Sequence, residues 1–171
     1  MTDDLERLYK TTYTAVVRFL YRKVWDADRA EDLAQEVFIR AMAHRPEKPR
    51  AWVFAVAANL ARDEARSAIR RRKHLTLLSA DPLPMSTPEP PADEQLEIDE
   101  RKEHVNQALA TLSDRDREVL LLWDAGMSYP EIAEQTGLAL GAIGTTLARA
   151  RKRLLDAYDR MEVDRSRAAH S

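Results

Sequence analysis

Cysteine is absent from this sequence of 171 residues. Its absence excludes disulfides, thiolate-ligated zinc and a cysteine nucleophile. Long apolar runs are absent too: the longest, residues 51–61, has 11 residues and includes Asn59, whereas a membrane-spanning helix needs about 20. The N-terminal segment MTDDLERLYK lacks the basic start and apolar run of a signal peptide. We therefore expect a soluble, cytoplasmic protein with no membrane insertion.

Glycine and the common catalytic motifs are also scarce. The sequence has only 4 Gly and is rich in Ala, Leu, Arg, Glu and Asp, a composition that disfavours a turn-dense β fold. Its 4 His residues are scattered without the spacing of a metal site, and no phosphate-binding loop or nucleophile elbow is present. We expect no enzymatic activity, no metal and no cofactor.

The formal net charge is only -2, but the charges are unevenly distributed. Residues 1–75 carry 16 basic and 11 acidic residues, whereas residues 76–98 carry five acidic residues and no basic ones. Two dense basic clusters lie at residues 70–73 and 149–153. Such clusters favour nucleic acid, because each neutralised phosphate releases condensed counterions. They are equally typical of helix ends, where Lys and Arg are preferred, so charge alone leaves both interpretations open.

Proline marks the boundary between two parts of the chain. Five of the 8 prolines lie at residues 82–91, among acidic residues, a composition typical of an extended tether. We predict an all-α protein with two small helical domains, residues 1–75 and 96–160. A flexible Pro- and acid-rich linker at residues 76–95 would join them, and residues 161–171 would form a tail.

Helical periodicity of apolar residues predicts the elements within each domain. Before the linker, helices are expected at about residues 3–24, 28–43 and 49–74. After it they are expected at about residues 95–112, 114–125, 129–136 and 140–158. Ser128 and Glu131 have the spacing of a capping box, and Ser113 with Asp116 resembles one. Residues 159–171 are polar and predict a fraying tail.

The last two predicted helices have the pattern of a helix-turn-helix. SYPEIAEQTGLALGAIGTTLARARKRL combines a short helix carrying the small Ala133, a turn at Gly137, and a second helix with Ile143 and Leu147 on its inner face. A plain helical hairpin shares several of these features. The capped boundaries, the spacing and the basic end favour DNA binding.

Both halves resemble a known family. The segment LSDRDREVLLLWDAGMSYPEIAEQTGLALGAIGTTLARARKRL is similar to region 4 of bacterial sigma-70-family factors and, less closely, to the output domain of LuxR-type regulators. DRAEDLAQEVFIRAM resembles region 2.2 of extracytoplasmic-function (ECF) sigma factors, and AWVFAVAANLARDEARSAIRRR resembles the adjoining regions 2.3 and 2.4. The chain thus resembles an ECF sigma factor, an RNA polymerase subunit that binds the core enzyme and directs promoter-specific transcription initiation.

Two alternatives without a sigma role remain at this point. A LuxR-like transcriptional regulator would use the same helix-turn-helix, but its receiver domain would need strands that residues 1–75 do not predict. A helical protein-interaction module would have no need for both arginine clusters. The alternatives make different predictions, because only a sigma factor requires core polymerase for promoter-specific binding.

The resemblance implies three groups of site residues. Core-polymerase binding, on the β′ clamp helices, is expected from Asp28, Asp32, Gln35 and Glu36. Binding and melting of the minus-ten element is expected from the loop at residues 44–50 and from Trp52, Asn59, Arg62, Arg66, Arg70 and Arg71, although a core aromatic is also a common role for a tryptophan such as Trp52. Binding of the minus-thirty-five element is expected from Ser128, Tyr129, Thr145, Thr146, Arg149, Arg151, Lys152 and Arg153.

The predicted recognition helix departs from the common family pattern. Ala139 stands where a capping Ser is frequent, and Gly141 and Gly144 weaken the first turns. We therefore expect region 4 to depend more on phosphate contacts and DNA shape than on base hydrogen bonds. The implied partners are core RNA polymerase (β′ clamp helices and β flap), promoter DNA and an anti-sigma factor. Because this chain has no cysteine, thiol-based redox sensing would belong to the anti-sigma partner.

Overall fold

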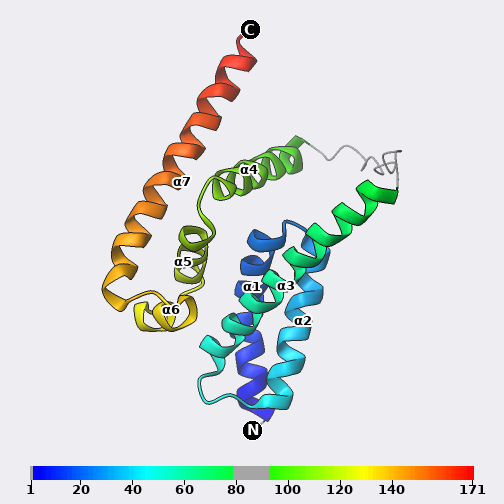
Figure 1. Ribbon diagram of the computed structural model, residues 1–171, viewed down its shortest axis with the longest axis vertical. Helices are drawn as coiled ribbons and strands as arrows, with labels where there is room; N and C mark the ends of the chain where they lie inside the picture. The colour runs from blue at the N-terminus through cyan, green and yellow to red at the C-terminus, as the bar shows by residue number, and fades with distance from the viewer. Residues whose placement is uncertain (1, 79–92) are drawn as a thin grey trace. The chain divides into compact units, whose positions relative to one another are not determined.

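The computed structural model describes residues 2–78 and 93–171, which form two compact units, Met1–Thr87 and Pro88–Ser171. The described residues form seven helices and no strand (Figure 1): α1 Thr2–Val24, α2 Ala27–His44, α3 Pro49–Leu78, α4 Asp93–Ala110, α5 Asp114–Asp124, α6 Tyr129–Thr136 and α7 Leu140–Ala169. The predicted all-α class is confirmed. Both ends of the predicted linker are helical, since α3 continues to Leu78 and α4 begins at Asp93, and residues 79–92 lie outside the described part.

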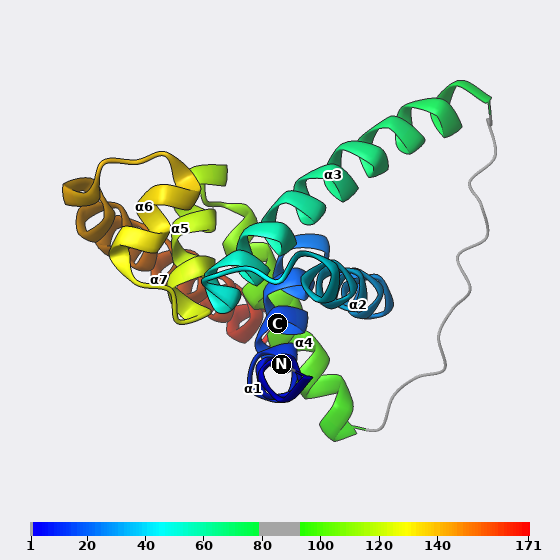
Figure 2. The ribbon, with the colours of Figure 1, turned by 90° about the horizontal axis from the view of Figure 1, so that it is seen from below.

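The first unit is a bundle of α1, α2 and α3, each of which packs on the other two. Val16 and Leu20 of α1, Val37 of α2 and Phe54 of α3 are fully buried at its centre. Phe19 meets Phe54 edge to face, with ring centroids 5.8 Å apart. The second half of α3 extends beyond α1 and α2 (Figure 2), and the side chains of Arg66 and Arg70 on it are exposed.

Local backbone signals set the ends of α2. Trp25 has a left-handed φ of 58°, and Asp26 follows as the N-cap, with its carboxylate accepting a hydrogen bond from the backbone N–H of Arg29 at 3.1 Å. Arg45, with φ 48°, closes the helix. The Arg29 guanidinium also donates to the Glu64 carboxylate at 2.8 Å, which ties the start of α2 to α3.

The second unit is formed by α4, α5, α6 and α7. Its core contains the fully buried Val119 and Leu122 of α5, Ile132 of α6 and Ile143 of α7. The capping box predicted for α6 is confirmed: the Ser128 Oγ accepts from the Glu131 N–H at 3.3 Å, and the Ser128 N–H donates to Glu131 Oε1 at 3.0 Å. Gly137, with φ 75°, ends α6 in the conformation that favours glycine.

The predicted tail is wrong. α7 does not end near Tyr158 but continues to Ala169 and packs along α4. Arg165 pairs with Glu100 at 2.7 Å, and the ring of His104 lies 3.1 Å from Glu162. Because these polar residues find partners on another helix, a polar sequence that predicts fraying forms three more helical turns instead.

Candidate nucleic-acid interface

One face of α3 gathers the residues predicted to contact the minus-ten element. Trp52, Asn59, Arg62, Arg66 and Arg70 recur at steps of three, four and seven, which places them on a single side of the helix. Asn59 and the three arginines are exposed, and Trp52 is half-buried. The side chain of Arg71 lies outside the described residues.

The amide of Asn59 is oriented by its neighbour on this face. Arg62 Nη1 donates a hydrogen bond to Asn59 Oδ1 at 3.0 Å. The amide oxygen is therefore engaged within the helix, and the same exposed side chain carries two N–H donors on its nitrogen. Such a group can donate to an acceptor on a base edge.

The connection between α2 and α3 is bordered by two stacked rings. His44 at the end of α2 and Trp52 in the first turn of α3 lie with centroids 5.2 Å apart and planes 10° from parallel. Beside the connection, an open groove of about 760 Å³ is lined by the first half of α1, the end of α2 and residues 45–50, including Leu8, Met42 and Pro46. The groove has both apolar and charged walls.

The outer face of α2 carries another continuous stripe. Asp28, Asp32, Gln35, Ile39 and Met42 follow steps of three and four and are all exposed. Ile39 and Met42 were not among the residues predicted to bind polymerase, although Ile39 is 60% and Met42 is 54% exposed. The stripe is thus acidic in its first half and apolar in its second. Glu36 lies to one side of it and pairs with Arg40 at 2.7 Å.

The helix-turn-helix consists of α6 and the first half of α7. Ser128 and Tyr129 lie exposed at the start of α6, and the Tyr129 ring is close to Gly144 on α7, where an added Cβ would stand 3.7 Å from Cε2. Ala139 occupies the N-cap of α7 with no side-chain cap bond, as its apolar side chain requires.

The exposed stripe of α7 contains Gly141, Thr145, Ala148, Arg149 and Lys152. Thr146 is not part of it: only 6% of this residue is exposed, so the prediction that it faces a DNA groove is wrong. A threonine one position from the stripe turns about 100° around the helix and enters the core. On this stripe only Arg149 and Lys152 carry long basic side chains.

Residues on α5 hold three of the four basic residues at 149–153. Asp116, whose side chain is 2% exposed, accepts from Arg149 Nη2 at 2.8 Å and from Arg153 Nη1 at 3.4 Å. The hydrogen bond from Arg149 is the main cause that lowers the pKa of Asp116 below its usual value, against the opposing effect of burial. The Arg151 guanidinium lies 3.9 Å from the centre of the Trp123 ring.

Asp116 itself was missed as a functional residue. It was interpreted only as part of a cap, and Ser113 does cap α5 by accepting from the Asp116 N–H at 3.2 Å. A stronger signal was available: Asp116, Val119, Leu120 and Trp123 share one helical stripe, and an acid on the apolar stripe of a helix predicts a buried, paired carboxylate.

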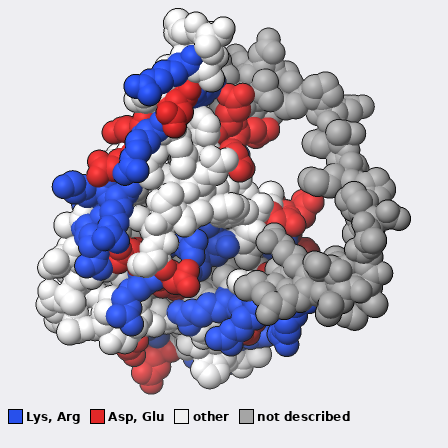
Figure 3. Space-filling view, turned by 45° about the horizontal axis from the view of Figure 1, so that its top comes forward, with Lys and Arg blue, Asp and Glu red and all other residues white. Residues whose placement is uncertain are grey.

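Basic and acidic side chains lie next to one another over the side seen in Figure 3. Within the described residues, no three His, Asp or Glu side chains are placed to hold a metal ion. The same part of the chain contains no helix long and apolar enough to cross a membrane.

The fold and these surfaces define a class: a protein of two helical units, one with an arginine-lined helix face and one with a helix-turn-helix. The comparisons agree on the family. The family described as Sigma-70 region 2 matches residues 8–72, and Sigma-70, region 4, matches residues 103–154. The chain belongs to the sigma-70 family of RNA polymerase sigma factors, in its ECF group.

Individual relatives cover most of the chain. The RNA polymerase sigma factor YlaC of Bacillus subtilis is 29% identical over 158 residues, which is 89% of this chain and 90% of YlaC. The ECF sigma factor SigL of Mycobacterium tuberculosis is 33% identical over 151 residues, 84% of this chain and 82% of SigL. The sigma factor RpoE of Bartonella quintana, solved with the anti-sigma factor NepR, shares the fold with a TM-score of 0.66 at 24% identity, covering 91% of this chain and 97% of RpoE.

These matches establish the function at the level of the family. The protein is an RNA polymerase sigma factor that directs transcription initiation, and it is not an enzyme. Because region 2 matches the first half of the chain, the LuxR-like alternative, which explains only the helix-turn-helix, is not favoured.

Proposed function

We propose that the two domains of this ECF sigma factor, residues 1–75 and 96–160, have different functions in transcription initiation. The first binds core RNA polymerase in the cytoplasm and opens the minus-ten element, and the second binds the minus-thirty-five element. The observation that carries this proposal is that most of the predicted site residues lie on continuous stripes of α2, α3 and α7 that are largely exposed.

We assign core-polymerase binding to the outer stripe of α2. Asp28, Asp32 and Gln35 face outward, with Glu36 beside them, and all suit a basic partner surface such as the β′ clamp helices. Exposed ion pairs each contribute about 1 kcal/mol or less. The exposed Ile39 and Met42 on the same stripe supply the apolar contact area that the acids lack.

Minus-ten opening is assigned to α3 and to the connection at residues 44–50. The N–H donors of the exposed Asn59 side chain suit an unstacked base, and the groove beside the connection is large enough to receive one. Arg62, Arg66 and Arg70 on the same face suit the phosphates that flank it. The half-buried Trp52, stacked on His44, supports the connection.

For the minus-thirty-five element, α6 and α7 provide the contacts. The exposed start of α6, with Ser128 and Tyr129, suits a phosphate near a helix N-terminus. Thr145 and Arg149 are the polar groups at the exposed start of α7, and Lys152 follows one turn later. Because Arg149, Arg151 and Arg153 are held by α5, they present fixed charges rather than flexible ones.

An anti-sigma partner is also part of the proposal. RpoE was solved with the anti-sigma factor NepR, and CnrH with the cytosolic domain of CnrY; both share this fold. Because this chain belongs to the same family, we expect an anti-sigma factor that covers the α2 stripe and thereby prevents it from binding polymerase. Since the chain has no cysteine, a thiol-based signal would act on that regulator.

Run-off transcription from a promoter library with purified core polymerase tests the proposal. With the chain present, a discrete set of start sites should appear whose upstream sequences share two elements. Asn59→Asp keeps an oxygen for Arg62 and removes the two donors, so it should reduce opening at the minus-ten element while retaining core binding. Asn59→Gln serves as the matched control that keeps the amide. Start sites that are unchanged without the chain would contradict the proposal.

A further inference from the structure

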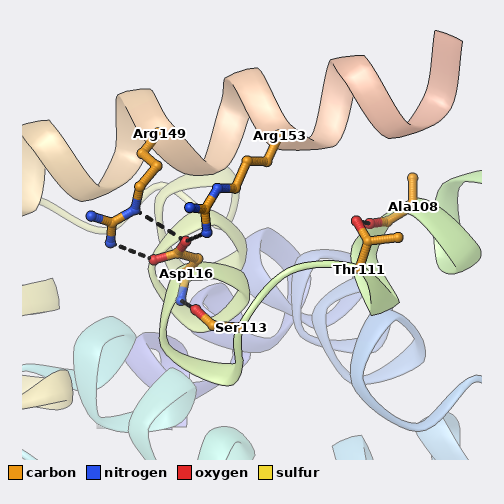
Figure 4. Close-up of polar contacts among 6 residues, drawn as sticks. All are labelled: Ala108, Thr111, Ser113, Asp116, Arg149 and Arg153. Atoms are coloured by element: carbon orange, nitrogen blue, oxygen red, sulfur yellow. Dashed lines mark hydrogen bonds and ion pairs between the residues drawn. The ribbon is translucent and has the colours of Figure 1, made fainter. Parts of the chain in front are cut away.

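A buried carboxylate lies under the exposed stripe of α7. Figure 4 shows Asp116 of α5 pointing at Arg149 and Arg153 of α7, one turn apart. Arg149 Nη2 donates to Asp116 Oδ1 at 2.8 Å and Arg149 Nε to Oδ2 at 3.3 Å, while Arg153 Nη1 donates to Oδ2 at 3.4 Å. The carboxylate side chain is 2% exposed, whereas that of Arg149 is 47% exposed.

The contact with Asp116 fixes the orientation of the Arg149 guanidinium as well as its distance from the carboxylate. Nε and Nη2 lie along one edge of the planar guanidinium, so two bonds from that edge to two carboxylate oxygens set the plane of the group. The opposite edge, with Nη1 and the second hydrogen of Nη2, is not used by Asp116, and the Arg149 side chain is 47% exposed. A guanidinium held in this way loses less side-chain freedom when it binds a further acceptor.

The charge balance leaves this cluster able to bind an anion. Two guanidinium groups share one carboxylate, so the cluster retains one net positive charge. A simple structural tie between α5 and α7 would need only one arginine. Of the other exposed positions on this stripe, Gly141, Thr145 and Ala148 have no side chain that can donate two hydrogen bonds to a guanine. Lys152 can reach a guanine, but its single ammonium lacks the planar, two-point geometry of the guanidinium.

We propose that Asp116 is a positioning residue for promoter recognition: it holds the guanidinium of Arg149 so that its free edge faces the major groove of the minus-thirty-five element. This inference rests on the proposed function, in which the exposed stripe of α7 binds that element. It changes the sequence-based expectation for region 4, because one oriented arginine provides direct base recognition in a helix otherwise short of it.

The experiment uses the full chain with core polymerase and a set of promoters carrying each single-base change in the minus-thirty-five element. Asp116→Asn keeps the size of the side chain but loses the charge and one acceptor. We expect it to reduce discrimination by about tenfold at the base pair that Arg149 contacts. Arg149→Ala should lose the same discrimination, and the double variant should lose no more. Asp114→Asn is the matched control: Asp114 lies two residues before Asp116 on α5, its side chain is 98% exposed and it pairs with Arg117, so the substitution removes the same charge without touching Arg149.

Each outcome decides the inference. If Asp116→Asn melts at a lower temperature but discriminates as the wild type does, Asp116 is only a structural tie and the inference is overturned. Tighter, equally selective binding by Asp116→Asn would show that Asp116 withholds Arg149 from DNA, which also overturns it. If Asp116→Asn does not fold, Arg149→Lys, which keeps the charge but not the two-point contact, should show the same loss; unchanged discrimination there overturns the inference. A wild-type chain that starts no transcripts would overturn the proposed function, and the inference with it.

Discussion

Asp116 is a carboxylate that is buried yet ionised, and its environment makes the stability of the second unit dependent on pH. The hydrogen bond from Arg149 lowers the pKa of Asp116 in the folded chain below its ordinary value of 3.8. A group with a lowered folded pKa stabilises the fold fully above its unfolded pKa, and the contribution is lost as the pH falls through the folded value. Stability from this group should therefore be complete above about pH 4 and decline in stronger acid.

We predict that Asp116→Asn lowers the free energy of unfolding at pH 7 by about 1–2 kcal/mol, because a hydrogen-bonded buried charge is lost. The value is at the lower end for buried charges since the arginine partners are about half exposed. Urea unfolding at pH 7 and pH 3 measures the free energy of unfolding of both proteins. The difference in this free energy between variant and wild type should be smaller at pH 3. An equal difference at both pH values would contradict the ionised assignment.

Gly144 offers a stabilising substitution within the recognition helix. It lies inside α7, where glycine costs about 1 kcal/mol relative to alanine, and a Cβ there would meet Tyr129 at an ordinary contact distance of 3.7 Å. Gly144→Ala should raise the melting temperature of the second unit. Gly137→Ala is the opposite control, since Gly137 has φ +75° and should destabilise. If both substitutions change stability in the same direction, the helix-propensity argument fails.

The sequence predicted which residues lie on the functional helices better than it predicted which way they face. The sequence placed the predicted minus-ten residues on α3 but left open which of the arginines share a face with Asn59; the structure places Arg62, Arg66 and Arg70 there. Thr146 was expected on the exposed face because it is polar, although it lies three residues after the buried Ile143 and next to the buried Leu147. The position of Asp116 on an apolar stripe indicates that it is buried, but its partner Arg149 lies 33 residues further along the chain, and no local pattern identifies that partner.

At the scale of elements, helix starts were the most predictable feature. Ser113 and Ser128 cap α5 and α6 as expected, because capping depends on residues three apart. The end of α7 was not predictable, because the last 11 residues of the helix after Tyr158 are stabilised through α4 rather than by their own apolar pattern. A helix whose polar residues are paired on another helix has no signature in its own sequence.

Truncation tests the role of this helical extension. A chain ending at Tyr158 should lose the Arg165–Glu100 pair and the contact between His104 and Glu162, and unfold with about 1–2 kcal/mol less free energy. Circular dichroism and urea unfolding measure the change. Glu100→Gln in the full chain is the matched variant, which should account for part of the loss. Unchanged stability of the truncated chain would show that the extension is helical without supporting the unit.

At the scale of the whole molecule, the two units present different surfaces, as the proposed division of function requires. The first unit presents a mixed acidic and apolar stripe on α2 and an arginine-lined face on α3. The second presents α7, in which the Arg149 side chain is held by an ion pair with Asp116 of α5. The sequence was sufficient for the class, the domain order and the acidic half of the α2 stripe. It was not sufficient for the apolar half, because Ile39 and Met42 resemble core residues until the packing shows them exposed.

The apolar half of the α2 stripe makes a prediction about assembly with polymerase. Ile39 is 60% exposed and lies in line with Asp32 and Gln35, so its burial against core polymerase should contribute more than any one exposed acid. Ile39→Asp should therefore weaken binding to core polymerase by at least tenfold with little change in melting temperature, measured by competition of labelled wild-type chain for the core enzyme. Val163→Asp is the matched control, because Val163 is 50% exposed on α7 and outside the stripe. Equal losses from both substitutions would indicate a general effect of the added charge, whereas no loss from Ile39→Asp would confine the docking surface to the acidic half of α2.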